Sequence, residues 1–99
     1  MNWYYISFAT ETEFLGSTVV EGYSETQALQ IATNNALNPG GQAAVIKIPN
    51  YLLTAPDIEP LKYKLFNREQ MKALGAHRYG DLTSHQKMAF ELGATVIGG

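Results

Sequence analysis

The chain has 99 residues, of which 45% are hydrophobic and 16% are charged, and its formal net charge is −2 at pH 7. This composition is typical of a globular protein with one modest core, because disorder accompanies low hydrophobicity and high charge. The absence of cysteine excludes disulfides and thiolate zinc sites, and no apolar run approaches the roughly 20 residues that span a bilayer.

The charges are unevenly placed along the chain. Residues 1–46 contain glutamates but no lysine or arginine, so all seven basic residues lie in the second part. Because phosphate neutralisation by Lys and Arg dominates nucleic-acid affinity, we expect no duplex DNA or RNA binding. The first residues lack the basic and long apolar regions of a signal peptide, so we expect a cytoplasmic protein.

The first half predicts two strands and a helix. Residues 3–8 and 14–23 are rich in aromatic and β-branched side chains, and the short polar link between them indicates an antiparallel hairpin. Ser24, with Gln27 three residues later, has the spacing of a capping box. The apolar residues that follow recur at the helical period and predict a helix over residues 25–37.

A third strand follows this helix. The run from Asn38 to Gly41 contains a proline and two glycines, which end a helix and allow a left-handed exit. Residues 42–48 then predict a strand that Pro49 closes. The first half therefore has the order strand, strand, helix, strand.

The alternation of side chains predicts two apolar sheet faces. The face that we expect under the helix carries Tyr4, Ile6, Phe8, Thr18, Val20, Ala44, Ile46 and Ile48. The opposite face carries Trp3, Tyr5, Val19 and Val45, with Ser7, Ser17 and Lys47. Because a sheet covered on one side alternates apolar and polar residues, something covers the second face as well. Three covers are open: the C-terminal half of the chain, a second subunit at a homo-oligomer interface formed by Trp3, Tyr5, Val19 and Val45, or a ligand.

The second half predicts an extended connection over residues 50–66 and two short helices in residues 67–99. Asn67 has a cap spacing and opens a helix that stops at Gly75. Thr83 or Ser84 caps a last helix that ends at Gly93, and residues 94–97 form either a tail strand or a frayed end. The whole chain is thus predicted to be a single α+β domain, with a small antiparallel sheet and one main helix on one face.

No motif supports catalysis or metal binding. The glycines at 40 and 41 follow a helix, whereas a phosphate loop precedes one. His77, Asp81 and His85 have a metal-like spacing, but Gly80 breaks the helix that would align them. We expect neither an enzyme nor a cofactor or metal.

Cations and aromatic residues are interleaved in the second half. Arg with aromatic side chains can hold a phosphate and stack a base, and it is equally common in protein interfaces. Solvated charges beside core aromatics are the third interpretation. The candidate ligand-binding residues are Arg68, Arg78, His77, Lys62, Lys64, Tyr51, Tyr63 and Tyr79.

Residues 3–49 carry a specific pattern, which returns weakly over residues 65–74 and 80–82. Its elements are Trp3-Tyr4-Tyr5-Ile6, Phe8-Ala9, Phe14-Leu15-Gly16, Val20-Glu21, Ser24 with Ala28, Leu37-Asn38-Pro39-Gly40-Gly41 and Ile48-Pro49. This pattern resembles small accessory proteins encoded by bacteriophages and prophages. The residues after Leu82 depart from it.

The resemblance implies a counter-defence role in the host cytoplasm. The favoured expectation is a homo-oligomer that sequesters an anionic, nucleotide-type immune signal without cleaving it. The alternative is a stoichiometric inhibitor that covers a surface of a host defence protein, in the manner of an anti-CRISPR protein. An antitoxin-like regulator and an undetected hydrolase are more remote alternatives.

Overall fold

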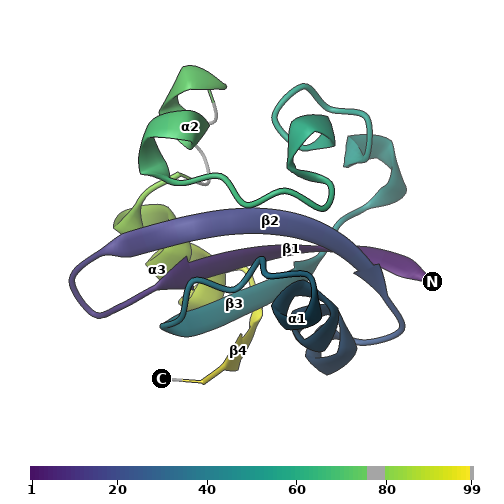
Figure 1. The fold of residues 1–99 in the computed structure, drawn as a ribbon, viewed down its shortest axis with the longest axis horizontal. Coiled ribbons are helices and arrows are strands. Elements are labelled where there is room, and N and C mark those ends of the chain that lie inside the picture. The colour runs from purple at the N-terminus through teal and green to yellow at the C-terminus, as the bar shows by residue number, and fades with distance from the viewer. Residues whose placement is uncertain (76–79, 99) are drawn as a thin grey trace.

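The structure is a computed structural model that describes residues 1–75 and 80–98. Its strands are β1 (Asn2–Ala9), β2 (Phe14–Gly22), β3 (Gln42–Lys47) and β4 (Thr95–Ile97), and its α-helices are α1 (Glu25–Asn34), α2 (Arg68–Ala73) and α3 (Leu82–Phe90). The strands form one antiparallel sheet in the order β2-β1-β3-β4 (Figure 1). The predicted α+β class and the initial strand-strand-helix-strand order are confirmed.

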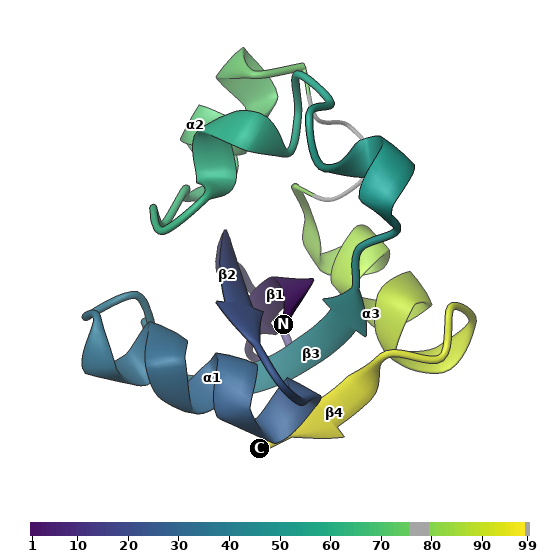
Figure 2. The ribbon, with the colours of Figure 1, turned by 90° about the vertical axis from the view of Figure 1, so that its right-hand side faces the viewer.

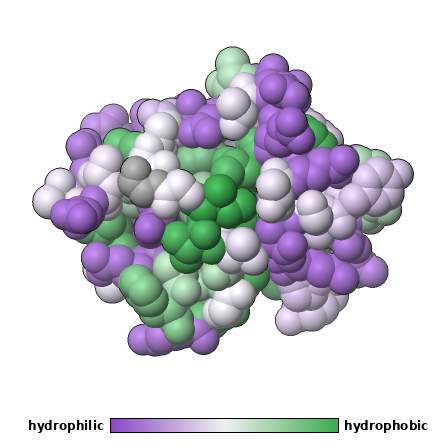
Figure 3. Space-filling model, turned by 90° about the horizontal axis from the view of Figure 1, so that it is seen from below, coloured by the Kyte–Doolittle hydropathy of each residue, from purple (hydrophilic) through white to green (hydrophobic). Residues whose placement is uncertain are grey.

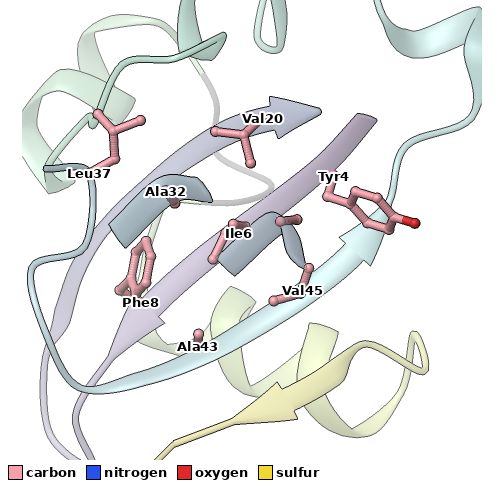
Figure 4. Packing of buried hydrophobic residues seen from close by; sticks show 9 residues of the cluster. Tyr4, Ile6, Phe8, Val20, Ala32, Leu37, Ala43 and Val45 are labelled. Atoms are coloured by element: carbon pink, nitrogen blue, oxygen red, sulfur yellow. The ribbon is translucent and has the colours of Figure 1, made fainter. Parts of the chain in front are cut away.

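Helix α1 covers one face of the sheet. The Ser24 side chain accepts a hydrogen bond from the Gln27 backbone N–H at 3.1 Å, so Ser24 is the N-cap of the helix. The reciprocal half of the predicted capping box is displaced by one residue, because Gln27 Oε1 accepts from the Tyr23 N–H at 2.6 Å rather than from the Ser24 N–H. Two small residues of the helix, Ala28 and Ala32, are fully buried against the strands. The cluster beneath the helix, seen in Figure 4, consists of Tyr4, Ile6, Phe8, Val20, Ala28, Ala32, Leu37, Ala43 and Val45.

The C-terminal half of the chain covers the other face. Figure 2 shows α1 on one side of β2 and β1, with α2 and the 50–66 segment on the opposite side. This second cluster consists of Tyr5, Phe14, Val19, Ile48, Ile58, Leu61, Met71 and Met88. Of the three covers that the sequence left open, the chain's own second half is the one observed.

The expected oligomer interface is wrong for most of its residues. Tyr5, Val19 and Val45 are buried within the chain, and Trp3 is half-buried. Side chains enclosed in this way have no surface to offer a second subunit.

The predicted phase of β3 is also wrong. Val45 pairs with Ile6 and therefore lies under α1, whereas Ile46 pairs with Tyr5 and lies on the other face. A shift of one residue exchanges the two faces of a strand. Since residues 43–46 are all apolar, alternation along β3 carried no information about which face each side chain takes.

Helix α1 ends at Asn34, three residues before the predicted end, and the exit does not use a glycine. Ala36 adopts a left-handed φ of 58°. The Leu37 N–H donates to Ala32 O at 2.8 Å and the Ala36 N–H to Thr33 O at 3.2 Å, which is the hydrogen-bond pattern of a Schellman motif. This early exit places Leu37 back in the core.

The connection over residues 50–66 is less extended than predicted. It contains two short 3₁₀ helices, η1 (Asn50–Leu52) and η2 (Glu59–Leu61), and its end runs along the free edge of β2. There Ser17 and Phe66 exchange two backbone hydrogen bonds of 2.9 Å, and the Tyr63 N–H donates to Val19 O at 2.7 Å. The β2 edge of the sheet is thus closed.

The C-terminal elements differ from the prediction mainly at their boundaries. Asn67 and Gln70 form the predicted capping box of α2. Helix α3 is capped by Asp81 rather than by Thr83 or Ser84, because Asp81 Oδ1 accepts the Ser84 N–H at 2.7 Å. The tail is a strand, β4. In the part of the chain that the structure describes, no helix has the length and apolar character needed to cross a membrane.

Candidate functional site

A cleft of about 540 Å³ lies between α3 and the sheet, at the end where β1 finishes and β3 begins. We call it the α3 cleft. Its walls come from three places: the end of β1 with its turn, the start of β3, and one face of α3. The lining residues are Ala9, Thr10, Glu11, Gly41, Gln42, Leu82, His85, Gln86 and Phe90.

The local sequence of α3 explains which side chains reach this cleft. Asp81 fixes the first turn, and the His85 N–H continues it by donating to Asp81 O at 3.1 Å. Residues three apart lie on one face of a helix, so His85 and Met88 both turn toward the sheet and are buried. Phe90 lies on a different face and is 81% exposed at the rim.

His85 has one hydrogen-bond partner in the interior. Its Nδ1 lies 2.9 Å from Ser7 Oγ of β1, and both side chains are buried. Burial lowers the pKa of His85 from its usual 6.5, and hydrogen bonding to Ser7 opposes that shift only in part. His85 is therefore neutral near pH 7, with one ring nitrogen as donor and the other as acceptor.

The other ring nitrogen of His85, Nε2, is buried with no hydrogen-bond partner in the described part of the chain, and the same holds for Thr18 Oγ1. A second polar pair lies nearby, because Ser7 pairs with Ser17 across the strands and the Tyr5 hydroxyl donates to Ser17 Oγ at 2.6 Å. Polar groups thus extend from β2 through β1 to α3 on the face of the sheet that carries the second cluster.

The distance between Ser7 and His85 suits a nucleophile and its base, but a nucleophile must also be accessible to its substrate. Ser7 is fully enclosed, so its hydroxyl cannot meet a substrate in this conformation. The geometry supports a structural role for the pair, which fixes α3 on the sheet and places Phe90 beside the cleft.

Lys62 and Tyr63, two of the expected ligand-binding residues, are engaged with neighbours. Lys62 Nζ lies 2.9 Å from Glu59 Oε2 and 5.0 Å from the centre of the Trp3 ring. The Tyr63 ring meets the Trp3 ring edge-on, with centroids 5.8 Å apart. Lys62 and Tyr63 both pack against Trp3. Because the Lys62 ammonium group already contacts Glu59 and the Trp3 ring, it is poorly placed to bind a phosphate.

Arg68 lies in a second cleft, of about 620 Å³, on the other side of the β1–β2 turn. Three carboxyl groups, from Glu13, Glu69 and Asp81, line the same cleft. Their negative charges disfavour an anionic ligand at Arg68.

The remaining candidates that the structure describes do not join these residues in one pocket. Lys64 and Tyr51 are exposed, and neither lines the two clefts described above. His77, Arg78 and Tyr79 lie outside the described residues. Within the described ranges, no group of three or more His, Asp or Glu side chains could hold a metal ion.

Sequence reasoning missed the α3 cleft. Ser7 and His85 were available as residues, but they are 78 positions apart and only the packing of α3 brings them together. The usable signal was Phe90, a large aromatic residue off the buried face of the last helix.

The sequence matches no known family model, no curated protein and no solved structure.

Proposed function

We propose that this is a non-catalytic binding protein that acts by stoichiometric contact with another protein, and that the α3 cleft with Phe90 is its contact site. The observation that carries the proposal is the exposure of Phe90, 81% of whose surface faces solvent at the rim of a concave cleft. Large aromatic side chains dominate the binding energy of protein interfaces when a partner desolvates them.

The surroundings of Phe90 suit this role. Gln42 and Gln86 line the cleft as uncharged polar residues, and among the described residues Glu11 is the one charged residue that lines it. A polar rim around an aromatic anchor is typical of protein interfaces. The buried pair of Ser7 and His85 holds the helix that carries the anchor, so the anchor is presented in a fixed position.

Sequestration of an anionic nucleotide, the expectation that the sequence favoured, has less support. Lys62 forms an ion pair with Glu59 and lies over the Trp3 ring, and Arg68 lies in a cleft that three carboxyl groups line. The kind of partner rests on the resemblance to phage accessory proteins alone: a bacterial protein of antiviral defence.

The test compares the wild-type protein with one variant and one matched control. Phe90→Glu adds a charge at the proposed anchor, and Tyr23→Glu adds the same charge at an aromatic residue that is 72% exposed and does not line the cleft. Each immobilised protein is exposed to bacterial lysate, and bound proteins are quantified by mass spectrometry. The expected result is one captured bacterial protein that binds the wild type and Tyr23→Glu with equal affinity. The same protein is expected to bind Phe90→Glu at least about tenfold more weakly.

The purified partner is then titrated calorimetrically to establish one-to-one binding. A partner retained by Phe90→Glu would move the site elsewhere. A panel of cyclic and linear nucleotides provides the second arm, because a ligand at 100 times its Kd stabilises the fold by about 2.7 kcal/mol. A rise in Tm with a nucleotide, without any protein partner, would favour sequestration and overturn the proposal.

A further inference from the structure

Strand β4 is the open edge of the sheet. It pairs with β3 through Thr95, Val96 and Ile97, and its other side has no hydrogen-bonded strand among the described residues. In an antiparallel ladder an edge strand leaves alternate N–H and C=O groups facing outward. The opposite edge, at β2, is closed by residues 62–66.

The open edge lacks most of the usual protections against strand pairing, and its short length of three residues is the one that it has. Natural proteins place charges, prolines or bulges on exposed edges, or cover them. Residues 92–98 contain neither a charged residue nor a proline, and β4 continues the ladder without a register shift. Over its three residues, this edge is therefore free to pair with another strand.

The surface along β4 is apolar. Figure 3, which views the side of the molecule that bears β4 and α1, shows a hydrophobic patch between hydrophilic regions. From β4 itself, Val96 is 40% exposed and Ile97 is half-buried beside the α1 cluster. Since the strand is only three residues long, this apolar area has to supply much of the energy of any pairing.

We propose that β4 is the interface for a second copy of this chain, which adds its own β4 in antiparallel orientation. With the two-fold axis at Val96, each Val96 lies opposite its equivalent, and Thr95 of one copy lies opposite Ile97 of the other. The segment is uncharged, so the axis brings no like charges together, and the exposed part of each Val96 meets its equivalent. Such self-complementarity is what an isologous dimer requires.

The dimer has a continuous antiparallel sheet in which the two four-stranded sheets are joined. A two-fold axis perpendicular to that sheet keeps both α1 helices on one face and both α3 helices on the other. The two α3 clefts then open on the same side, so the dimer binds a partner bivalently. This interface differs from the one that the sequence suggested, and it goes beyond the proposed function.

The experiment measures mass by sedimentation equilibrium over a micromolar concentration range. Wild type is expected at twice the chain mass of 10.9 kDa. Val96→Lys places two lysines against each other at the axis, and we expect its dimer to dissociate at least about tenfold more readily, because like charges directly opposite destabilise paired strands. The control, Tyr23→Lys, carries the same charge at an exposed aromatic residue away from β4 and stays dimeric.

A charge-reversal pair tests the axis itself. Val96→Lys mixed with Val96→Glu is expected to restore a dimer, because residue 96 meets residue 96. Circular dichroism and Tm establish that each variant is folded. If Val96→Lys fails to fold, amide hydrogen exchange of wild-type residues 94–98 replaces it, and protection that increases with protein concentration is expected.

Three results would overturn the inference. They are a wild type that remains a 10.9 kDa monomer at about 100 μM, a Val96→Lys dimer as stable as wild type, and exchange protection at β4 that does not depend on concentration. None of these results bears on Phe90, so failure of the dimer and failure of the proposed function are separable.

Discussion

Ser7 Oγ and His85 Nδ1 lie 2.9 Å apart, although 78 positions separate them in the sequence. The contact joins β1 to α3 on the face of the sheet that carries the second apolar cluster. Because both side chains are buried, breaking it leaves a polar group without water or a protein partner.

This contact predicts a non-additive mutant cycle. Ser7→Ala leaves His85 Nδ1 unpartnered and is expected to lower the free energy of unfolding by about 1–3 kcal/mol. Ser7→Ala combined with His85→Leu removes both polar partners, together with the unpartnered Nε2, and is expected to recover most of that loss. Urea denaturation of the wild type, both single variants and the double variant measures the coupling, and strictly additive effects would contradict the interpretation.

Stability is expected to fall in mild acid through His85. Its pKa is lowered by burial in the folded state, so from about pH 6.5 downward the unfolded chain binds more protons than the folded chain. The contribution is complete above pH 6.5 and is lost as the pH falls toward the lower folded-state pKa. Denaturation between pH 5.5 and 7.5 should show a slope that disappears in His85→Leu and remains in Glu11→Gln, a change of an acidic residue in the same cleft.

Gly41 and Gly75 give a matched pair of glycine substitutions. Their φ angles are +73° and +75°, so an alanine suffers similar left-handed strain at either position. A Cβ at Gly41 would lie 2.6 Å from Ala9 O, whereas, its chain neighbours aside, no described residue has an atom within 4 Å of one at Gly75. We expect Gly41→Ala to be the more destabilising, by about 1 kcal/mol or more, and equal losses in chemical denaturation would count against the close approach of β1 to residue 41.

Ala36 is a site for stabilisation. It holds the left-handed position of the Schellman motif with φ of 58°, which glycine adopts at lower cost. Ala36→Gly is expected to raise the free energy of unfolding by about 1 kcal/mol. The same substitution at Ala73, exposed at the end of α2, is expected to lower it by about 0.5–1 kcal/mol. Thermal unfolding of both variants shows whether the change in the free energy of unfolding is positive at residue 36 and negative at residue 73.

The local features of the fold were predictable because short-range chemistry determines them. Ser24 caps α1 through the Gln27 N–H, and Asn67 with Gln70 forms a capping box, from neighbouring residues alone. The phase of β3 was not predictable, since its apolar run offers no polar residue to mark a face. The end of α1 was missed because an alanine occupies a position where the sequence pattern favours glycine.

The candidate site was harder to predict than the fold. Lys62 and Arg68 were identified by residue type, but their neighbours Glu59, Trp3 and Glu13 decide what they can bind. Those neighbours become adjacent only through tertiary packing. The α3 cleft has the same origin, because its walls come from the end of β1, the start of β3 and α3.

The two-sided sheet has a consequence for synthesis on the ribosome. When residues 1–49 have emerged, β1, β2, α1 and β3 can assemble, yet Tyr5 and Val19 still await the residues that bury them. An exposed apolar face at this stage is prone to aggregation. A ribosome-bound chain arrested at the point where residues 1–49 have just left the exit tunnel should therefore bind a hydrophobic dye and recruit chaperones, and both signals should disappear once α3 has been released.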